Sequence, residues 1–109
     1  MGRLVKGEVV VLAYPFSDLS RTKRRPAVVA TPPGDDVILS QMTSRSRADP
    51  SAIAITQSNF ATGTFHQPGN VRPNRTFAAD RGIILYSIGV LKPEVTNRMM
   101  DAIIRILRQ

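Results

Sequence analysis

The sequence contains no cysteine and no tryptophan, and only one histidine. Without cysteine, disulfide bonds and thiolate metal sites are excluded. The lone histidine, His66, lies in a polar stretch, where a histidine side chain is usually solvated rather than catalytic. A run of about 20 apolar residues, as a membrane span needs, is missing, and the first residues lack the apolar core of a signal peptide. We therefore expect a soluble, cytoplasmic protein without a membrane partner.

Acidic residues are also few, and they are scattered singly along the chain or lie together in one turn. Metal-assisted hydrolysis needs carboxylates that converge, so we predict no metal site and no cofactor. The Gly-x-Ser-x-Gly nucleophile motif and the phosphate-binding loop of nucleotide hydrolases are absent as well. The usual hydrolase chemistries therefore have no sequence support.

Positive charge is what the chain has in excess. Fifteen Lys and Arg residues against eight Asp and Glu residues give a formal net charge of +7. Such a balance is typical of a protein that binds a polyanion, with nucleic acid first and an anionic membrane or acidic protein segment as alternatives. The length of 109 residues predicts one domain, covering residues 1–109, with one core.

The order of apolar runs predicts a mainly β protein. β-branched or alternating runs bounded by turn residues predict strands over residues 9–14, 27–30, 37–42, 52–56, 71–77 and 85–91. Residues 31–36 form a turn cluster typical of an antiparallel hairpin, residues 58–70 are expected to be a surface loop, and a helical turn is expected from Asp80. The pattern predicts a curved antiparallel sheet or small barrel.

The chain then changes period. From Pro93, apolar residues fall on one helical face, formed by Val95, Met99, Ile103 and Ile106 and widened by Met100, Ile104 and Leu107. We predict a C-terminal amphipathic helix packed on the sheet.

The most informative segment is the basic end of the loop between the first two strands. Arg25 directly precedes Pro26, which favours extended backbone, so we expect Arg25 at the first residue of the second strand, facing a phosphate. Other cations recur on loops or near strand ends, at Lys23, Arg24, Arg45, Arg47, Arg72, Arg75 and Arg81. They can line a groove for a nucleic-acid backbone. A solvated strand end is the alternative for the basic cluster.

Four aromatic residues near these cations are candidate stacking faces for unpaired bases: Tyr14, Phe16, Phe60 and Phe65. Core packing is the alternative for Tyr14 and Phe16.

RNA cleavage is the reaction that such a site supports with the fewest groups. The 2′-hydroxyl of RNA already lies beside the phosphate, so an enzyme needs only proton transfer and charge stabilisation. Arg25 can stabilise the phosphorane or donate a proton, and the hydroxyl of Thr43, at the end of the third strand, can donate a hydrogen bond. A guanidinium stays protonated, so the proton acceptor is left open.

Several segments together resemble the MazF/PemK/Kid family of toxin endoribonucleases, especially its PemK-like branch. The matching segments span nearly the whole chain: residues 7–11 leading into 15–20, the basic run 23–29, the strand end 40–44, the strand 71–77, and the run 88–91 into Pro93 and Glu94. The Arg-Pro pair and the threonine at the strand end are the most specific parts.

The resemblance implies a curved SH3-like barrel of the CcdB/MazF type and a homodimer. It also implies metal-independent, sequence-specific cleavage of single-stranded RNA, leaving a 2′,3′-cyclic phosphate and a 5′-hydroxyl. Arg25 and Thr43 are its implied catalytic residues, residues 17–23 are a flap over RNA, and an antitoxin protein is the implied partner. With the groove cations, the predicted RNA contacts are Ser17, Asp18, Arg21, Lys23, Arg24, Gln41, Arg45, Arg47, Arg72 and Arg75.

One departure concerns the first loop, where some family members place a glutamate and this chain offers only Asp18. Three other interpretations remain: a nucleic-acid-binding barrel without catalysis, an inactive toxin, and a gyrase poison. The gyrase poisons act through an aromatic C-terminus, which this chain lacks. Fold alone does not choose among these functions.

Overall fold

The computed structural model describes residues 3–15, 22–32, 34–44 and 49–109. These residues form seven strands, two short 3-10 helices and one α-helix. The strands are β1 (Glu8–Pro15), β2 (Thr22–Thr31), β3 (Asp36–Thr43), β4 (Ile53–Ile55), β5 (Phe60–Gly63), β6 (Gly69–Asp80) and β7 (Ile84–Leu91). The helices are η1 (Gln57–Asn59), η2 (Arg81–Ile83) and α1 (Pro93–Leu107).

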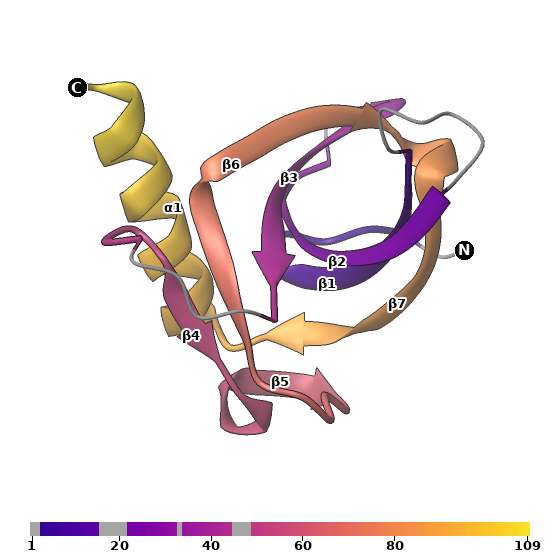
Figure 1. The fold of residues 1–109 in the computed structure, drawn as a ribbon, viewed down its shortest axis with the longest axis horizontal. Coiled ribbons are helices and arrows are strands. Elements are labelled where there is room, and N and C mark those ends of the chain that lie inside the picture. The colour runs from indigo at the N-terminus through magenta and orange to yellow at the C-terminus, as the bar shows by residue number, and fades with distance from the viewer. Residues whose placement is uncertain (1–2, 16–21, 33, 45–48) are drawn as a thin grey trace.

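All strands belong to one curled antiparallel sheet in the order β4-β6-β3-β2-β1-β7-β5. Figure 1 shows the sheet bending round into a ring, with α1 standing at one side against β6 and β4. The predicted fold class, a curved antiparallel sheet with a C-terminal helix, is confirmed. The α-helix has 15 residues, and no helix in the described ranges is long and apolar enough to span a membrane.

Side-chain alternation along the central strands builds two hydrophobic clusters, one on each face of the sheet. On β1, Val9 enters the cluster beneath α1, whereas Val10 and Leu12 enter the cluster inside the curl. Successive residues of a strand point to opposite faces, so a run of β-branched residues suits a strand that is covered on both sides. This explains why residues 9–12 are all buried.

The predicted helix is confirmed, with one correction to its apolar face. Val95, Met99 and Ile103 are buried in the cluster beneath α1. Ile104 and Leu107, which were expected to widen that face, are 46% and 78% exposed. Both residues lie among the last four residues of α1, and neither belongs to the cluster beneath the helix.

Two strand predictions were wrong. β2 starts at Thr22, so Arg25 is its fourth residue and not its first; the β1–β2 ladder continues through Pro15↔Thr22 and takes the basic run into the strand. The expected loop over residues 58–70 contains β5 and the start of β6. Phe60 is buried against β7, opposite Leu91, and is therefore a core residue and not a stacking face for bases.

The turn chemistry was predicted well. Residues 31–36 join β2 and β3 as an antiparallel hairpin. The helical turn after Asp80 is η2, where the Asp80 carboxylate accepts a hydrogen bond of 2.7 Å from the Gly82 N–H. This contact satisfies a donor at the helix start that has no partner within the helix.

Candidate functional site

The strand register brings Arg25 and Thr43 together. β2 and β3 pair at Val28↔Ser40 and Ala27↔Gln41, and Arg25 and Thr43 each lie two residues beyond this last pair, on facing strands. Residues directly opposite in an antiparallel pair project their side chains to the same face. The paired ladder stops at Ala27, next to Pro26, which has no N–H to donate. The two strands are therefore free to open into a cavity at this point.

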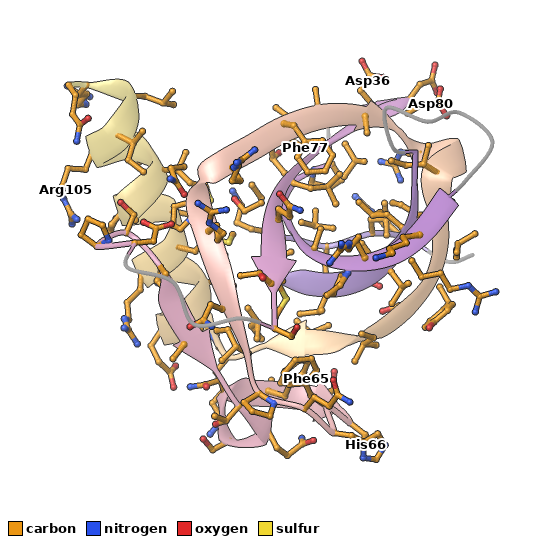
Figure 2. All side chains as sticks on the ribbon, viewed as in Figure 1. Asp36, Phe65, His66, Phe77, Asp80 and Arg105 are labelled. Carbon is orange, nitrogen blue, oxygen red and sulfur yellow. The ribbon has the colours of Figure 1, made fainter. Side chains whose placement is uncertain are left out.

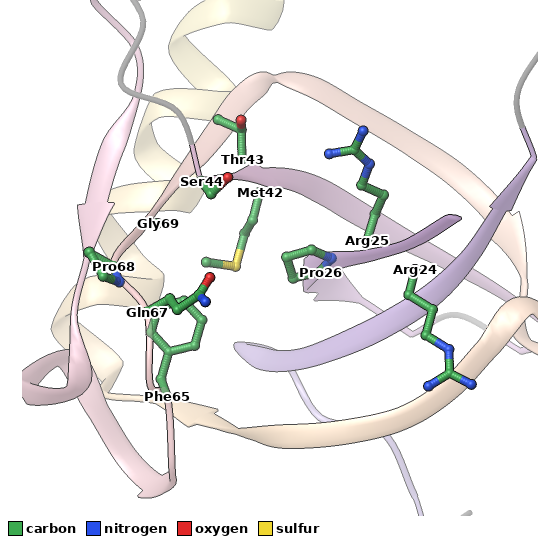
Figure 3. Close-up of a pocket in the computed structure, with 10 residues that line it drawn as sticks. All are labelled: Arg24, Arg25, Pro26, Met42, Thr43, Ser44, Phe65, Gln67, Pro68 and Gly69. Atoms are coloured by element: carbon green, nitrogen blue, oxygen red, sulfur yellow. The ribbon is translucent and has the colours of Figure 1, made fainter. Parts of the chain in front are cut away.

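A cavity of about 210 Å³ lies at this opening. Arg25 and Thr43 line it, together with Arg24, Pro26, Met42, Ser44 and the hairpin residues Phe65, Gln67, Pro68 and Gly69. Figure 3 shows Arg24 and Arg25 leaving β2 in opposite directions, as strand alternation requires. Of these two neighbours, Arg25 is the one on the side of Thr43. We call this the Arg25–Thr43 cavity.

A third strand continues the polar row. β6 places Asn70 opposite Thr43 and Arg72 opposite Gln41. Asn70 and Gln41 are both half-buried, as are Arg25 and Thr43. Sequence reasoning missed Asn70, because its position beside Thr43 depends on a register between strands more than 25 residues apart. Gln67 of the cavity wall was missed for the same reason, whereas Phe65, predicted as a candidate stacking face, does line the cavity.

Arg72 is held in an ion pair. Its Nε donates to Asp49 Oδ2 at 3.0 Å, and the two side chains are 15% and 7% exposed. The Asp49 Oδ1 accepts from the Ser51 N–H at 2.9 Å. The Ser51 hydrogen bond, followed by Arg72, lowers the pKa of the Asp49 carboxyl below its ordinary value. The positive charge of Arg72 is therefore largely balanced by the Asp49 carboxylate.

The other predicted contacts are more spread out. Lys23 on β2 and Arg75 on β6 are exposed, whereas Arg81 donates to the backbone carbonyls of Pro32 and Gly34 and thereby holds the β2–β3 turn. Five predicted RNA contacts lie outside the described residues, namely Ser17, Asp18, Arg21, Arg45 and Arg47, as does the candidate stacking residue Phe16. Within the described ranges, no three acidic or histidine side chains gather as a metal site would need.

Comparison with known proteins places this architecture. No protein-family model matches the chain, and no curated protein matches it in sequence. Among solved structures, MazE-MazF (Form-II) from Deinococcus radiodurans superposes with a TM-score of 0.76 and 17% identity, over 94% of both chains. An endoribonuclease in complex with its cognate antitoxin, from a mycobacterial species, superposes with a TM-score of 0.71 and 18% identity, over 99% of this chain and 96% of the other.

The chain has the MazF fold. A third structure, the Mycobacterium tuberculosis toxin MazF-mt6, matches at a TM-score of 0.67 and 16% identity, over 91% of this chain and 96% of the toxin. The coverage is nearly complete in both directions, so the MazF fold accounts for the whole sheet and for α1. At these identities the likeness concerns fold, and function has to be argued from the site.

Proposed function

We propose that this protein is an endoribonuclease toxin of a toxin–antitoxin system, cleaving single-stranded RNA at short sequences without a metal ion. The observation that supports the proposal is that Arg25 and Thr43 line one cavity, within a MazF fold. A chain with a net charge of +7 suits a polyanionic substrate.

The chemistry follows from what RNA itself supplies. The 2′-oxygen attacks the adjacent phosphorus and gives up its proton, the bond from phosphorus to the 5′-oxygen breaks, and the 5′-oxygen takes up a proton. The products are a 2′,3′-cyclic phosphate and a 5′-hydroxyl. Arg25 stabilises the negative charge that builds on the non-bridging oxygens, and the Thr43 hydroxyl donates a second hydrogen bond.

Arg25 and Thr43 are suited to stabilisation more than to proton abstraction. A guanidinium keeps its protons at ordinary pH, and a threonine hydroxyl is a weak base. Asp49 lies on the same polar row through Arg72, but its lowered pKa makes it a poor proton acceptor, and both of its oxygens already accept hydrogen bonds. We therefore assign no general base to Asp49.

The partners follow from the same proposal. We propose an antitoxin whose acidic segment competes with RNA for the basic cavity, because the same cations attract both.

We also propose a cytoplasmic homodimer, for which the exposed apolar residues Ile104 and Leu107 at the end of α1 are a candidate contact. Sedimentation of the purified chain tests the dimer, and a monomer at micromolar concentration would refute it.

The decisive experiment compares three substrates of one random sequence pool: RNA, 2′-O-methyl RNA and DNA, each incubated with the protein in EDTA. We expect only RNA to be cut, with 2′,3′-cyclic phosphate ends, because only RNA carries the attacking hydroxyl. Arg25→Ala should lower the rate about 100- to 1,000-fold, the range for loss of one charge-stabilising group, and Thr43→Val about 10-fold.

Two matched substitutions serve as controls. Arg98→Ala removes an exposed arginine from α1, and Thr62→Val changes an exposed threonine on β5, so neither touches the cavity. Both should keep the full rate. Cutting of all three substrates would rule out attack by the 2′-hydroxyl. Cutting of none, with RNA still bound, would favour the nucleic-acid-binding barrel without catalysis.

A further inference from the structure

A second cavity adjoins the Arg25–Thr43 cavity on the other side of the β5–β6 hairpin. Its volume is about 630 Å³, and it is lined by residues 63–67 of the hairpin and by Tyr86, Ser87 and Ile88 of β7. Phe65 and Gln67 line both cavities and so form the wall between them. We call the second one the hairpin cavity.

A pair of glycines sets its shape. Gly63 and Gly89 lie opposite each other, and a Cβ at Gly63 would stand 2.3 Å from the Ile88 carbonyl oxygen. Only glycine permits this approach, and Gly63 also has a φ of +96°, a region that disfavours other residues. The β5–β7 ladder ends at this pair, so among the described residues no strand covers the edge of β7 at residues 86–88 from this side.

The hairpin that forms the other wall is braced. The Gln57 side chain donates to the Gly63 carbonyl at 3.1 Å and accepts from the Phe65 N–H at 2.6 Å. The Phe65 ring stacks on the buried Phe60 with 5.3 Å between centroids. Figure 2 shows Phe65 turned toward the barrel and His66 turned away from it. The wall between the cavities is therefore preformed.

The lining of the hairpin cavity differs in chemistry from that of its neighbour. Among the described residues, two arginines line the Arg25–Thr43 cavity, whereas no lysine or arginine lines the hairpin cavity. Its groups are the Tyr86 ring, 46% exposed, and polar side chains that make no hydrogen bond within the described part of the chain, namely those of His66, Gln67 and Ser87. An exposed aromatic ring beside unused polar groups suits a flat, neutral ligand that carries hydrogen-bonding edges.

We propose that the hairpin cavity binds one nucleobase next to the scissile phosphate, with Tyr86 as its stacking face, and thereby sets part of the cleavage sequence. The inference rests on the proposed function, since the phosphate in the Arg25–Thr43 cavity brings the base to the other side of Phe65. Tyr86 contributes to RNA affinity and to the sequence preference, while Arg25 and Thr43 contribute to cleavage of the bond between phosphorus and the 5′-oxygen.

The test sequences the cut ends of the random RNA pool for the wild type, Tyr86→Ala and Tyr86→Phe. Tyr86→Ala should weaken the base preference at one position adjacent to the cut and lower kcat/KM for the preferred sequence about 5- to 100-fold, mainly through KM. Tyr86→Phe keeps the ring and should keep the preference. Unchanged preference and unchanged kcat/KM in Tyr86→Ala would overturn the inference.

Leu85→Ala is the matched control, because Leu85 is the next residue on β7, is 43% exposed and does not line the cavity. It should behave as wild type. A second readout is independent of cleavage: fluorescence anisotropy measures how tightly each variant binds a labelled 2′-O-methyl RNA pool. Tyr86→Ala should bind this pool more weakly than wild type, and Leu85→Ala as tightly as wild type. If wild type cuts no RNA, the proposed function fails. Equal binding of the 2′-O-methyl RNA pool by Tyr86→Ala and wild type would separately overturn the base site in the hairpin cavity.

Discussion

The ion pair between Arg72 and Asp49 fixes the entry to β4. Asp49 contacts β6 through Arg72 and caps its own turn through the Ser51 N–H. Both side chains are largely covered, so loss of either partner leaves the other charge poorly solvated. A residue predicted as an RNA contact is thus also part of the scaffold that carries the site.

Asp49→Ala should lower the melting temperature at pH 7 by a few degrees. The native state lowers the pKa of the Asp49 carboxyl, so the carboxylate contributes stability above its ordinary pKa of 3.8 and loses it as pH falls through the lowered native pKa. The difference between wild type and variant should therefore shrink as pH falls from 5 toward 2. Thermal melts followed by circular dichroism across that range measure it.

Asp35→Ala is the control, since Asp35 is exposed in the β2–β3 turn and its side chain has no partner among the described residues. Its melting temperature should stay close to wild type at both ends of the pH range. If the melting temperatures of wild type and Asp49→Ala differ by the same amount at every pH, the role assigned to the carboxylate is contradicted.

At the residue scale, the sequence offered candidate site residues but did not predict which residues lie next to them in space. Arg25 before Pro26 and Thr43 at a strand end were both recognisable from local patterns. The partners of Asp49 and the position of Asn70 were not, because a strand register depends on the packing of the whole sheet.

At the scale of elements, the close approach of β5 and β7 constrains which residues can occupy their contact. A side chain at Gly63 would meet backbone atoms of Ile88 and Gly89, which cannot move aside as a flexible side chain can. Gly63→Ala should therefore reduce the free energy of unfolding by roughly 2 kcal/mol or more, adding steric overlap to the usual 1–2 kcal/mol for a positive φ. Urea denaturation measures this loss.

Gly34→Ala separates the two causes. Gly34 has a φ of +63°, but a Cβ there would meet nothing within 4 Å. Its loss should be about 1 kcal/mol, from backbone conformation alone. Equal losses at Gly34 and Gly63 would mean that the close approach between β5 and β7 is not a constraint.

Strands with long β-branched runs, such as β1 and β3, were predicted within a residue or two at each end. β5 was missed because it has four residues, only one of them buried, and pairs with a strand that follows it by more than 20 residues. β2 was predicted too short, because its first residues are polar and are kept extended by pairing with β1. In both cases tertiary pairing overrode a weak local pattern.

At the scale of the whole molecule, the net charge of +7 should make RNA binding depend on salt. If Lys23, Arg24 and Arg25 each neutralise one phosphate, the slope of log K against log salt should be about −2, so affinity should fall roughly 15-fold between 50 and 200 mM salt. Titration of 2′-O-methyl RNA, which is not cut, measures the slope.

Lys23→Ala should make that slope shallower by about 0.7, whereas Arg98→Ala on α1 should leave it unchanged. A slope near zero for the wild type would argue against phosphate binding by the basic run. A slope that changes equally in both variants would assign binding to net charge and not to the cavity.

The overall architecture was within reach of the sequence, since alternating apolar runs predicted the sheet and a change of period predicted α1. The regular spacing of short strands also predicted the curl of the sheet, and the resemblance of short motifs agreed with it. The pairing of β4 and β5 at the two ends of the sheet was not predictable, because both are short strands that are held by distant partners.

Pro26 has a consequence for the state of the protein in solution. Between Thr22 and Pro26, β2 pairs with β1 but has no described ladder to β3, so this stretch is a half-open strand edge. Such edges can recruit strands of other molecules, and a proline within them, beside lysine and arginine, opposes that recruitment. The proline that ends the β2–β3 ladder beside the cavity therefore also opposes aggregation at this strand edge.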